Sequence, residues 1–95
     1  MIKSFHDRMT AKLHAGLCPK GVSRDLARAA YVKLLALDAA DRLEALATHS
    51  GMKLEKLSGD RKGQHSIRVN IQFRICFIWT GNDAEHVEFC DYHKG

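Results

Sequence analysis

The stretch QHSIRVNIQFRICFIW, residues 64–79, decides the fold because its side chains alternate between polar and apolar. From residue 67 every odd position is apolar or aromatic, and the even positions up to Arg74 are all polar. A period of two residues is typical of a β-strand with one face against a core. The stretch is too long for one ordinary strand, so we predict a hairpin that turns at residues 70–72.

The hairpin is followed by more sheet and preceded by helices. A turn at 81–83 and a strand over 85–91 extend the hairpin into a meander. Upstream, Ser23 is a good N-cap for a helix whose apolar residues recur at spacings of three and four. These residues are Leu26, Ala30, Leu34 and Leu37.

The remaining upstream segments complete the prediction. We expect a bend near Asp38, which caps a second short helix, another short helix over residues 7–15, and a short strand over residues 1–5. This order of elements predicts an α+β fold in which two or three helices pack on one face of a small, mostly antiparallel sheet.

Length and composition limit what such a chain does. Its 95 residues, 45% hydrophobic and 27% charged, predict a single folded domain over residues 1–95. A core of this size leaves no room for a deep cavity, so an active site is expected to be an open groove. The formal net charge of +4 is compatible with a polyanionic partner.

Cysteine spacing and hydropathy exclude several classes of protein. Cys18, Cys76 and Cys90 form no CxxC pair, so we expect small buried side chains in place of a disulfide framework or a zinc site. No apolar run approaches the roughly 20 residues that cross a bilayer, and no signal peptide is evident. A cytoplasmic protein without membrane partners is expected.

The hairpin register places two like charges together. A turn at 70–72 sets Arg68 opposite Arg74 on the face that does not enter the core. Facing like charges are unfavourable, which favours an anion between them. Two interpretations fit: a phosphate-binding groove, or a solvated face whose arginines pair with carboxylates of the last strand.

The positive charge is concentrated around this hairpin. Residues 51–74 contain six basic and two acidic side chains, a net charge of +4 that equals the charge of the whole chain. The candidate RNA-binding residues lie in this stretch: Lys53, Lys56, Arg61, Lys62, Gln64 and His65. His65 occupies an odd position, on the apolar face of the alternation, where a histidine at the edge of the core is expected more often than a catalytic one.

The C-terminal tripeptide is a second cluster of candidate catalytic residues. Asp91, Tyr92 and His93 offer a carboxylate, a phenol and an imidazole, which are groups that exchange protons near neutral pH. An exposed tail without a role is the alternative interpretation.

Several motifs together resemble a known family. The chain carries MIKSF at its start, LEKLSGDRKGQHSIRVNIQFRICFIW in its middle and VEFCDYH at its end. These stretches are similar to the HigB-type toxins, the plasmid maintenance killer protein family of the RelE/ParE superfamily. The resemblance covers essentially the whole chain and implies a compact RelE-like fold.

The resemblance also implies an activity and partners. It implies a bacterial toxin that cleaves mRNA in the A site of the 70S ribosome and is neutralised by a helix-turn-helix antitoxin of the HigA type. Arg68 and Arg74 would hold or polarise the scissile phosphate, and Asp91, Tyr92 and His93 would contribute proton transfer and substrate positioning.

Two positions depart from the family's pattern. Some HigB-like toxins have a histidine and a lysine where this chain has Glu55 and Ser58, which favours His93 as the general base. Gln64 and His65 are supporting candidates. RNA cleavage by the ribose 2′-hydroxyl requires a base, an acid and cations, and the sequence has no HxH-like set for two metals, so we expect no metal and no cofactor.

Two other functions remain open. A ParE-like gyrase poison would act by binding a protein and would have no need for the tripeptide at 91–93. A non-catalytic nucleic-acid-binding module would keep its effect when residues 91–95 are deleted. The aromatic residues argue against a binding module. Phe73, Phe77 and Trp79 lie at odd positions on the apolar face, so they are expected in the core and not as exposed platforms for stacking bases.

Overall fold

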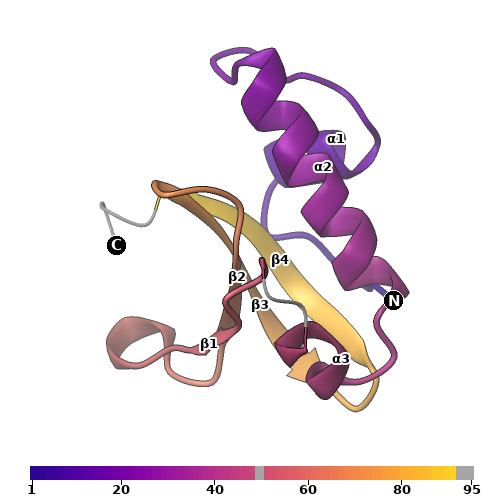
Figure 1. The fold of residues 1–95 in the computed structure, drawn as a ribbon, viewed down its shortest axis with the longest axis vertical. Helices are drawn as coiled ribbons and strands as arrows, with labels where there is room; N and C mark the ends of the chain where they lie inside the picture. Colours follow the sequence, from indigo (N-terminus) through magenta and orange to yellow (C-terminus); the bar gives the residue numbers. More distant parts are fainter. Residues whose placement is uncertain (49–50, 92–95) are drawn as a thin grey trace.

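The computed structural model describes residues 1–48 and 51–91. The elements follow in the order α1 (Arg8–His14), α2 (Arg24–Ala39), α3 (Leu43–Ala47), β1 (Glu55–Lys56), the 3-10 turn η1 (Gly59–Arg61), β2 (His65–Arg68), β3 (Phe73–Thr80) and β4 (Asp83–Asp91). The strands form one antiparallel sheet in the order β1-β2-β3-β4, with α1 and α2 to one side of it (Figure 1). The α+β prediction is confirmed.

The predicted hairpin forms in the predicted register. Ile67 pairs with Ile75, and Arg68 pairs with Arg74. The turn between them is closed by Asn70, whose Oδ1 accepts hydrogen bonds from the backbone N–H groups of Gln72 (2.8 Å) and Phe73 (2.7 Å). Asparagine suits this position because its side-chain oxygen accepts hydrogen bonds from the backbone N–H groups two and three residues later, which stabilises a turn.

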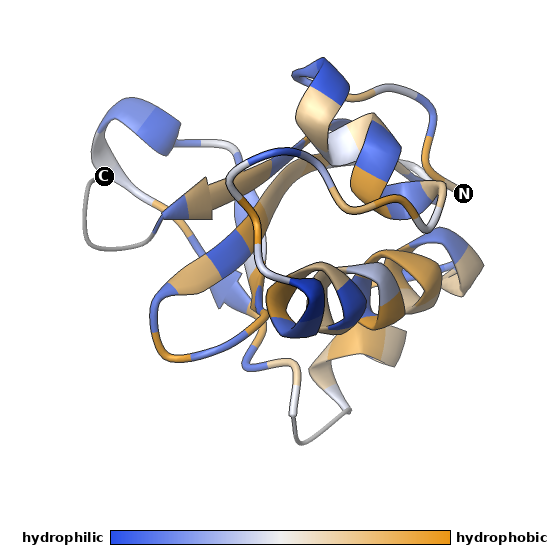
Figure 2. Ribbon diagram, turned by 90° about the horizontal axis from the view of Figure 1, so that it is seen from above, coloured by the Kyte–Doolittle hydropathy of each residue, from blue (hydrophilic) through white to orange (hydrophobic). Residues whose placement is uncertain are grey.

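The core lies between the helices and one face of the sheet. Its fully buried residues include Leu34 and Leu37 of α2 and Ile67, Ile75 and Phe77 of the hairpin. Hydrophobic residues recur along α2 and along the long strands (Figure 2). Each such side chain stabilises the fold by about 1.5–3 kcal/mol relative to exposure. In the described ranges 1–48 and 51–91, no helix is long and apolar enough to span a membrane.

Two details at the N-terminal side differ from the prediction. Asp38 does not cap a second helix, because α2 continues through it to Ala39. Its carboxylate instead accepts a hydrogen bond from the N–H of Ile2 (2.8 Å) and lies 4.0 Å from His14. The predicted strand over residues 1–5 is reduced to two isolated parallel bridges, Ile2 to Ala84 and Phe5 to Val87.

An irregularity in β4 sets which side chains face away from the helices. Between the pairs Cys76–Glu88 and Ile78–Glu85, β4 contains one residue more than β3, and His86 adopts a positive φ of 53°. Such a β-bulge reverses the alternation along the strand. It therefore lets Val87 enter the core while Glu88 faces away from the helices.

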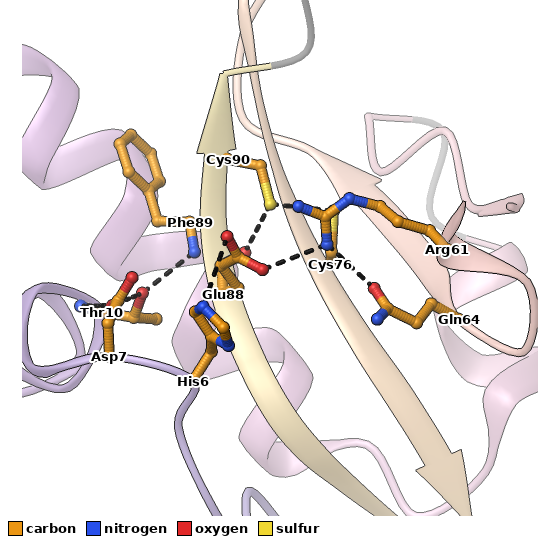
Figure 3. Close-up of polar contacts among 9 residues, drawn as sticks. All are labelled: His6, Asp7, Thr10, Arg61, Gln64, Cys76, Glu88, Phe89 and Cys90. Carbon is orange, nitrogen blue, oxygen red and sulfur yellow. Dashed lines mark hydrogen bonds and ion pairs between the residues drawn. The ribbon is translucent and has the colours of Figure 1, made fainter. Parts of the chain in front are cut away.

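Thr10 ties α1 to the last strand. Its buried hydroxyl donates to the N-cap Asp7 (2.7 Å) and accepts from the N–H of Phe89 (2.9 Å), as Figure 3 shows. We expect Thr10→Val to lower the free energy of unfolding by about 1–3 kcal/mol, because Phe89 loses its acceptor in a dry site. Urea unfolding measures this loss. Thr10→Ser, which keeps the hydroxyl, is the matched control, and equal loss in both variants would contradict the role of the hydrogen bond.

Candidate active-site groove

Arg74 of β3 lies on the face of the sheet that the helices do not cover. Its side chain is held by Ser66 and by the backbone of Lys53: Nε donates to Ser66 Oγ (2.6 Å), and one terminal nitrogen donates to the Lys53 carbonyl (2.6 Å) and the Ser66 carbonyl (3.3 Å). Ser66 is opposite Cys76 in the sheet, and Lys53 adopts a positive φ of 48°. The guanidinium is thus fixed in one orientation. Arg74 as a whole is 7% exposed, so this part of the polar face is not the open surface that alternation predicts.

Arg68 and Arg74 share a small hollow. Its volume is about 220 Å³, and it is lined by Arg68, Asn70, Ile71 and Arg74. Arg68 Nε donates to the Asn70 carbonyl (3.2 Å), so the same turn that fixes the register also orients this arginine. Ile71 is 79% exposed at the rim. The lining contains two cations and no acid, which suits a phosphate group.

Arg74 also lines a second, larger groove. Its volume is about 1030 Å³, and Arg74 and Asp91 both line it. Its lining contains three Lys or Arg side chains, Lys56, Arg61 and Arg74, and two histidines, His6 and His86, against four acids, Glu55, Asp60, Glu88 and Asp91. The groove is therefore mixed in charge, and Arg74 is the residue that it shares with the small hollow.

Arg61 is partly neutralised inside this groove. One terminal nitrogen lies 3.1 Å from Glu88 and 3.1 Å from the side-chain oxygen of Gln64, and His6 approaches the other oxygen of Glu88 at 3.9 Å (Figure 3). The hydrogen bond to Glu88 raises the pKa of Arg61 above its ordinary value. Arg61 is therefore expected to orient a substrate more than to bind a phosphate alone.

The other predicted RNA-binding residues separate into two groups. Lys56 and Gln64 line the larger groove with Arg61. Lys53 and Lys62 are exposed and are not among its lining residues. His65 lies away from it, stacked on Phe77 with ring centroids 6.2 Å apart, and burial lowers its pKa. The interpretation of His65 as a rim histidine fits this position better than a part in catalysis.

The C-terminal tripeptide is described only in part. Asp91 ends β4, lines the groove with Arg74 and accepts a hydrogen bond from the Gln72 amide (3.0 Å). Tyr92 and His93 lie outside the described residues. Their predicted roles remain predictions.

The sequence did not reveal several members of the groove. Ser66 and Glu88 appeared only as polar residues on strands, and their roles depend on contacts across the sheet. The cysteine prediction was right only for Cys76, since Cys18 is exposed and Cys90 is half-buried in the groove wall. His6, Asp7 and Glu88 also place ligand atoms within 4.8 Å of one another. Asp7 caps α1 and Glu88 pairs with Arg61, so both carboxylates already have partners.

Comparison with known structures gives the class of fold. The chain is similar to a chain of the YoeB–YefM complex from Staphylococcus aureus, with a TM-score of 0.61, 17% sequence identity and 98% coverage of both chains. This similarity shows a shared fold.

Sequence comparison gives the family. Residues 3–93 match the family of HigB-like toxins, described as RelE-like toxins of type II toxin-antitoxin systems. The chain is 37% identical to Toxin HigB-1 of Vibrio cholerae over 73 residues, which cover 77% of this chain and 76% of that protein. It is 34% identical to Endoribonuclease HigB of Proteus vulgaris over 94 residues, 98% of this chain and all of that protein. The chain belongs to the HigB-like toxin family, and as a toxin of a toxin-antitoxin system it has an antitoxin partner.

Proposed function

We propose that this toxin is an endoribonuclease that cuts mRNA in the A site of the 70S ribosome. It acts as one domain in the bacterial cytoplasm and is neutralised by a helix-turn-helix antitoxin of the HigA type. The name of the Proteus vulgaris relative, Endoribonuclease HigB, supports the activity, since that protein is matched along its full length.

The observation that carries the proposal is the position of Arg74. It lines both the small hollow with Arg68 and the larger groove with Asp91, so the two hollows meet at one fixed guanidinium. An RNA strand that passes from one hollow to the other has a phosphate over Arg74. Planar guanidinium groups bind phosphate oxygens in defined directions, which suits a single scissile position.

The chemistry assigned to the site is transfer of the phosphate to the neighbouring 2′-hydroxyl. A base removes the proton of the 2′-hydroxyl, the oxygen attacks the phosphorus, and the 5′-oxygen leaves with a proton from an acid. Arg68 and Arg74 stabilise the added negative charge on the phosphate. His93 is the proposed base, with Asp91 and Tyr92 positioning the substrate or supplying the proton.

Dependence on the ribosome follows from the mixed charge of the groove. Because four acids line it against three Lys and Arg side chains, a free RNA strand gains little net attraction along its length. A ribosome that holds the mRNA supplies the orientation that the groove does not, and well-oriented reactants gain several kcal/mol, about 7 or more in the best cases.

We expect purified toxin to cleave ribosome-bound mRNA at least ~100-fold faster than the same RNA free in solution. Primer extension on matched samples, with and without 70S ribosomes, measures the ratio. A ribosome-bound RNA with an empty A site and one with that site blocked by tRNA form the control pair. Equal cutting of free and bound RNA would rule out ribosome dependence while leaving the nuclease activity in place.

A further inference from the structure

Two cysteines of neighbouring strands meet in the wall of the larger groove. Cys76 of β3 and Cys90 of β4 both line it, and their Sγ atoms are 3.0 Å apart, with Cys90 donating to Cys76 (Figure 3). Both are free thiols. They are diagonal neighbours in the sheet, because Cys90 pairs with Arg74 and Cys76 pairs with Glu88.

We propose that Cys76 and Cys90 form a modification site at which hydrogen peroxide converts the dithiol into a reversible intramolecular disulfide. The sulfurs need to close by only about 1 Å to reach the length of a disulfide bond. The reagent is small, which matters because Cys76 is 4% exposed. This proposal concerns the thiols alone and does not depend on the RNA chemistry proposed above.

The two thiols are unequal, which assigns the order of the steps. The hydrogen bond from Cys90 and the nearby Arg61 guanidinium lower the pKa of Cys76. Donation of that hydrogen bond, together with burial, raises the pKa of Cys90. Cys76 is therefore the thiolate that reacts first, since the thiolate is the reactive form.

The reaction balances with peroxide as the only oxidant. The Cys76 thiolate attacks one oxygen, the O–O bond breaks, and hydroxide leaves, giving a sulfenic acid. Cys90 Sγ then attacks the Cys76 sulfur, the S–O bond breaks, and the leaving oxygen takes the Cys90 proton and departs as water. Two thiols are oxidised and one peroxide is reduced to water.

If solvent exposure alone set the reactivity of the cysteines, a different thiol would be oxidised first. Cys18 is the exposed cysteine, and its Sγ lies 3.1 Å from the backbone oxygen of Val22. In the described part of the chain no other sulfur is recorded near it. If accessibility decided reactivity, Cys18 would react first and link two chains together.

The test treats reduced, full-length toxin with hydrogen peroxide and maps its peptides without reductant. We expect a loss of about 2 Da per chain, a peptide pair joined through Cys76 and Cys90, and full reversal by dithiothreitol. The Cys18→Ser variant is expected to give the same product. Cys90→Ser is expected to give no crosslink within the chain and a Cys76 sulfenic acid, which dimedone labels when the peroxide-treated chain is unfolded in its presence. Oxidation confined to Cys18, or three free thiols after treatment of the wild-type chain, would overturn the proposal, and neither readout requires a variant to fold.

Discussion

We expect the replacement of Arg74 with alanine to lower the rate of the proposed ribosome-dependent RNA cleavage by about 100- to 1000-fold, the range seen when one preorganised donor to a developing charge is lost. The physical reason is its fixed orientation: Ser66 and the Lys53 carbonyl hold the guanidinium where the two hollows meet. Single-turnover cleavage of mRNA on ribosomes measures the effect. We expect the same loss to appear in cells as disappearance of growth arrest.

Two variants separate this role from a general loss of stability. Arg74→Lys retains the charge but not the fork of donors, so we expect it to recover only part of the rate. Arg61→Ala removes another groove arginine, one already paired with Glu88, and is expected to cost less than Arg74→Ala. Thermal unfolding measures whether each variant is folded at the assay temperature. Equal activity of Arg74→Ala and wild-type toxin would contradict the assignment.

Replacing His93 with alanine is the second large expected effect. Loss of a general base costs about 100- to 10,000-fold in rate, and His93 is the proposed base. The remaining activity is expected to increase steeply with pH, because hydroxide then takes the proton that imidazole normally accepts. Cleavage rates between pH 6 and 9 measure both features.

His14→Gln is the matched control for this variant. His14 lies on α1 beside Phe5 and Asp38, and it is not among the residues that line either hollow. We expect its pH profile and rate to match those of the wild-type toxin. A His93→Ala variant with an unchanged rate and pH profile would transfer the role of base to another residue, such as Asp91.

The sequence predicted the hairpin and its two arginines because these features are local. The period of two fixes which side chains share a face, and the turn around Asn70 fixes the register, so the pairing of Arg68 with Arg74 follows from a few residues. The N-cap at Ser23 is equally local, since its hydroxyl accepts from the N–H of Leu26 three residues later.

Features that depend on distant contacts were not predictable. The break expected near Asp38 is present just after it, since α2 ends at Ala39 and the short helix α3 follows at Leu43–Ala47. Only the capping role given to Asp38 was wrong, because its carboxylate accepts from the N–H of Ile2, 36 residues away, and lies 4.0 Å from His14. Arg74 is buried because Lys53 and Ser66 bond it from other segments, although alternation placed it on an open face. The bulge at His86 adds a residue that no periodic pattern anticipates, and this residue brings Glu88 opposite Arg61.

The charge pattern illustrates the same limit. The net charge of residues 51–74 pointed to the hairpin region as the binding site, but it did not include the acids of β4. Glu88 and Asp91 reach the groove only when the sheet forms. The small hollow is therefore lined by Arg68 and Arg74 without an acid, whereas the lining of the larger groove is mixed in charge.

Mapping transcript 5′ ends after brief expression of the toxin tests the central claim most directly. The account predicts new 5′ ends within translated coding regions, absent from untranslated RNA and absent when Arg74→Ala is expressed instead. Intact transcripts combined with gyrase-dependent breaks in DNA would contradict it and would identify a gyrase poison. Growth arrest with neither RNA nor DNA breaks would instead show that the groove binds nucleic acid without cutting it.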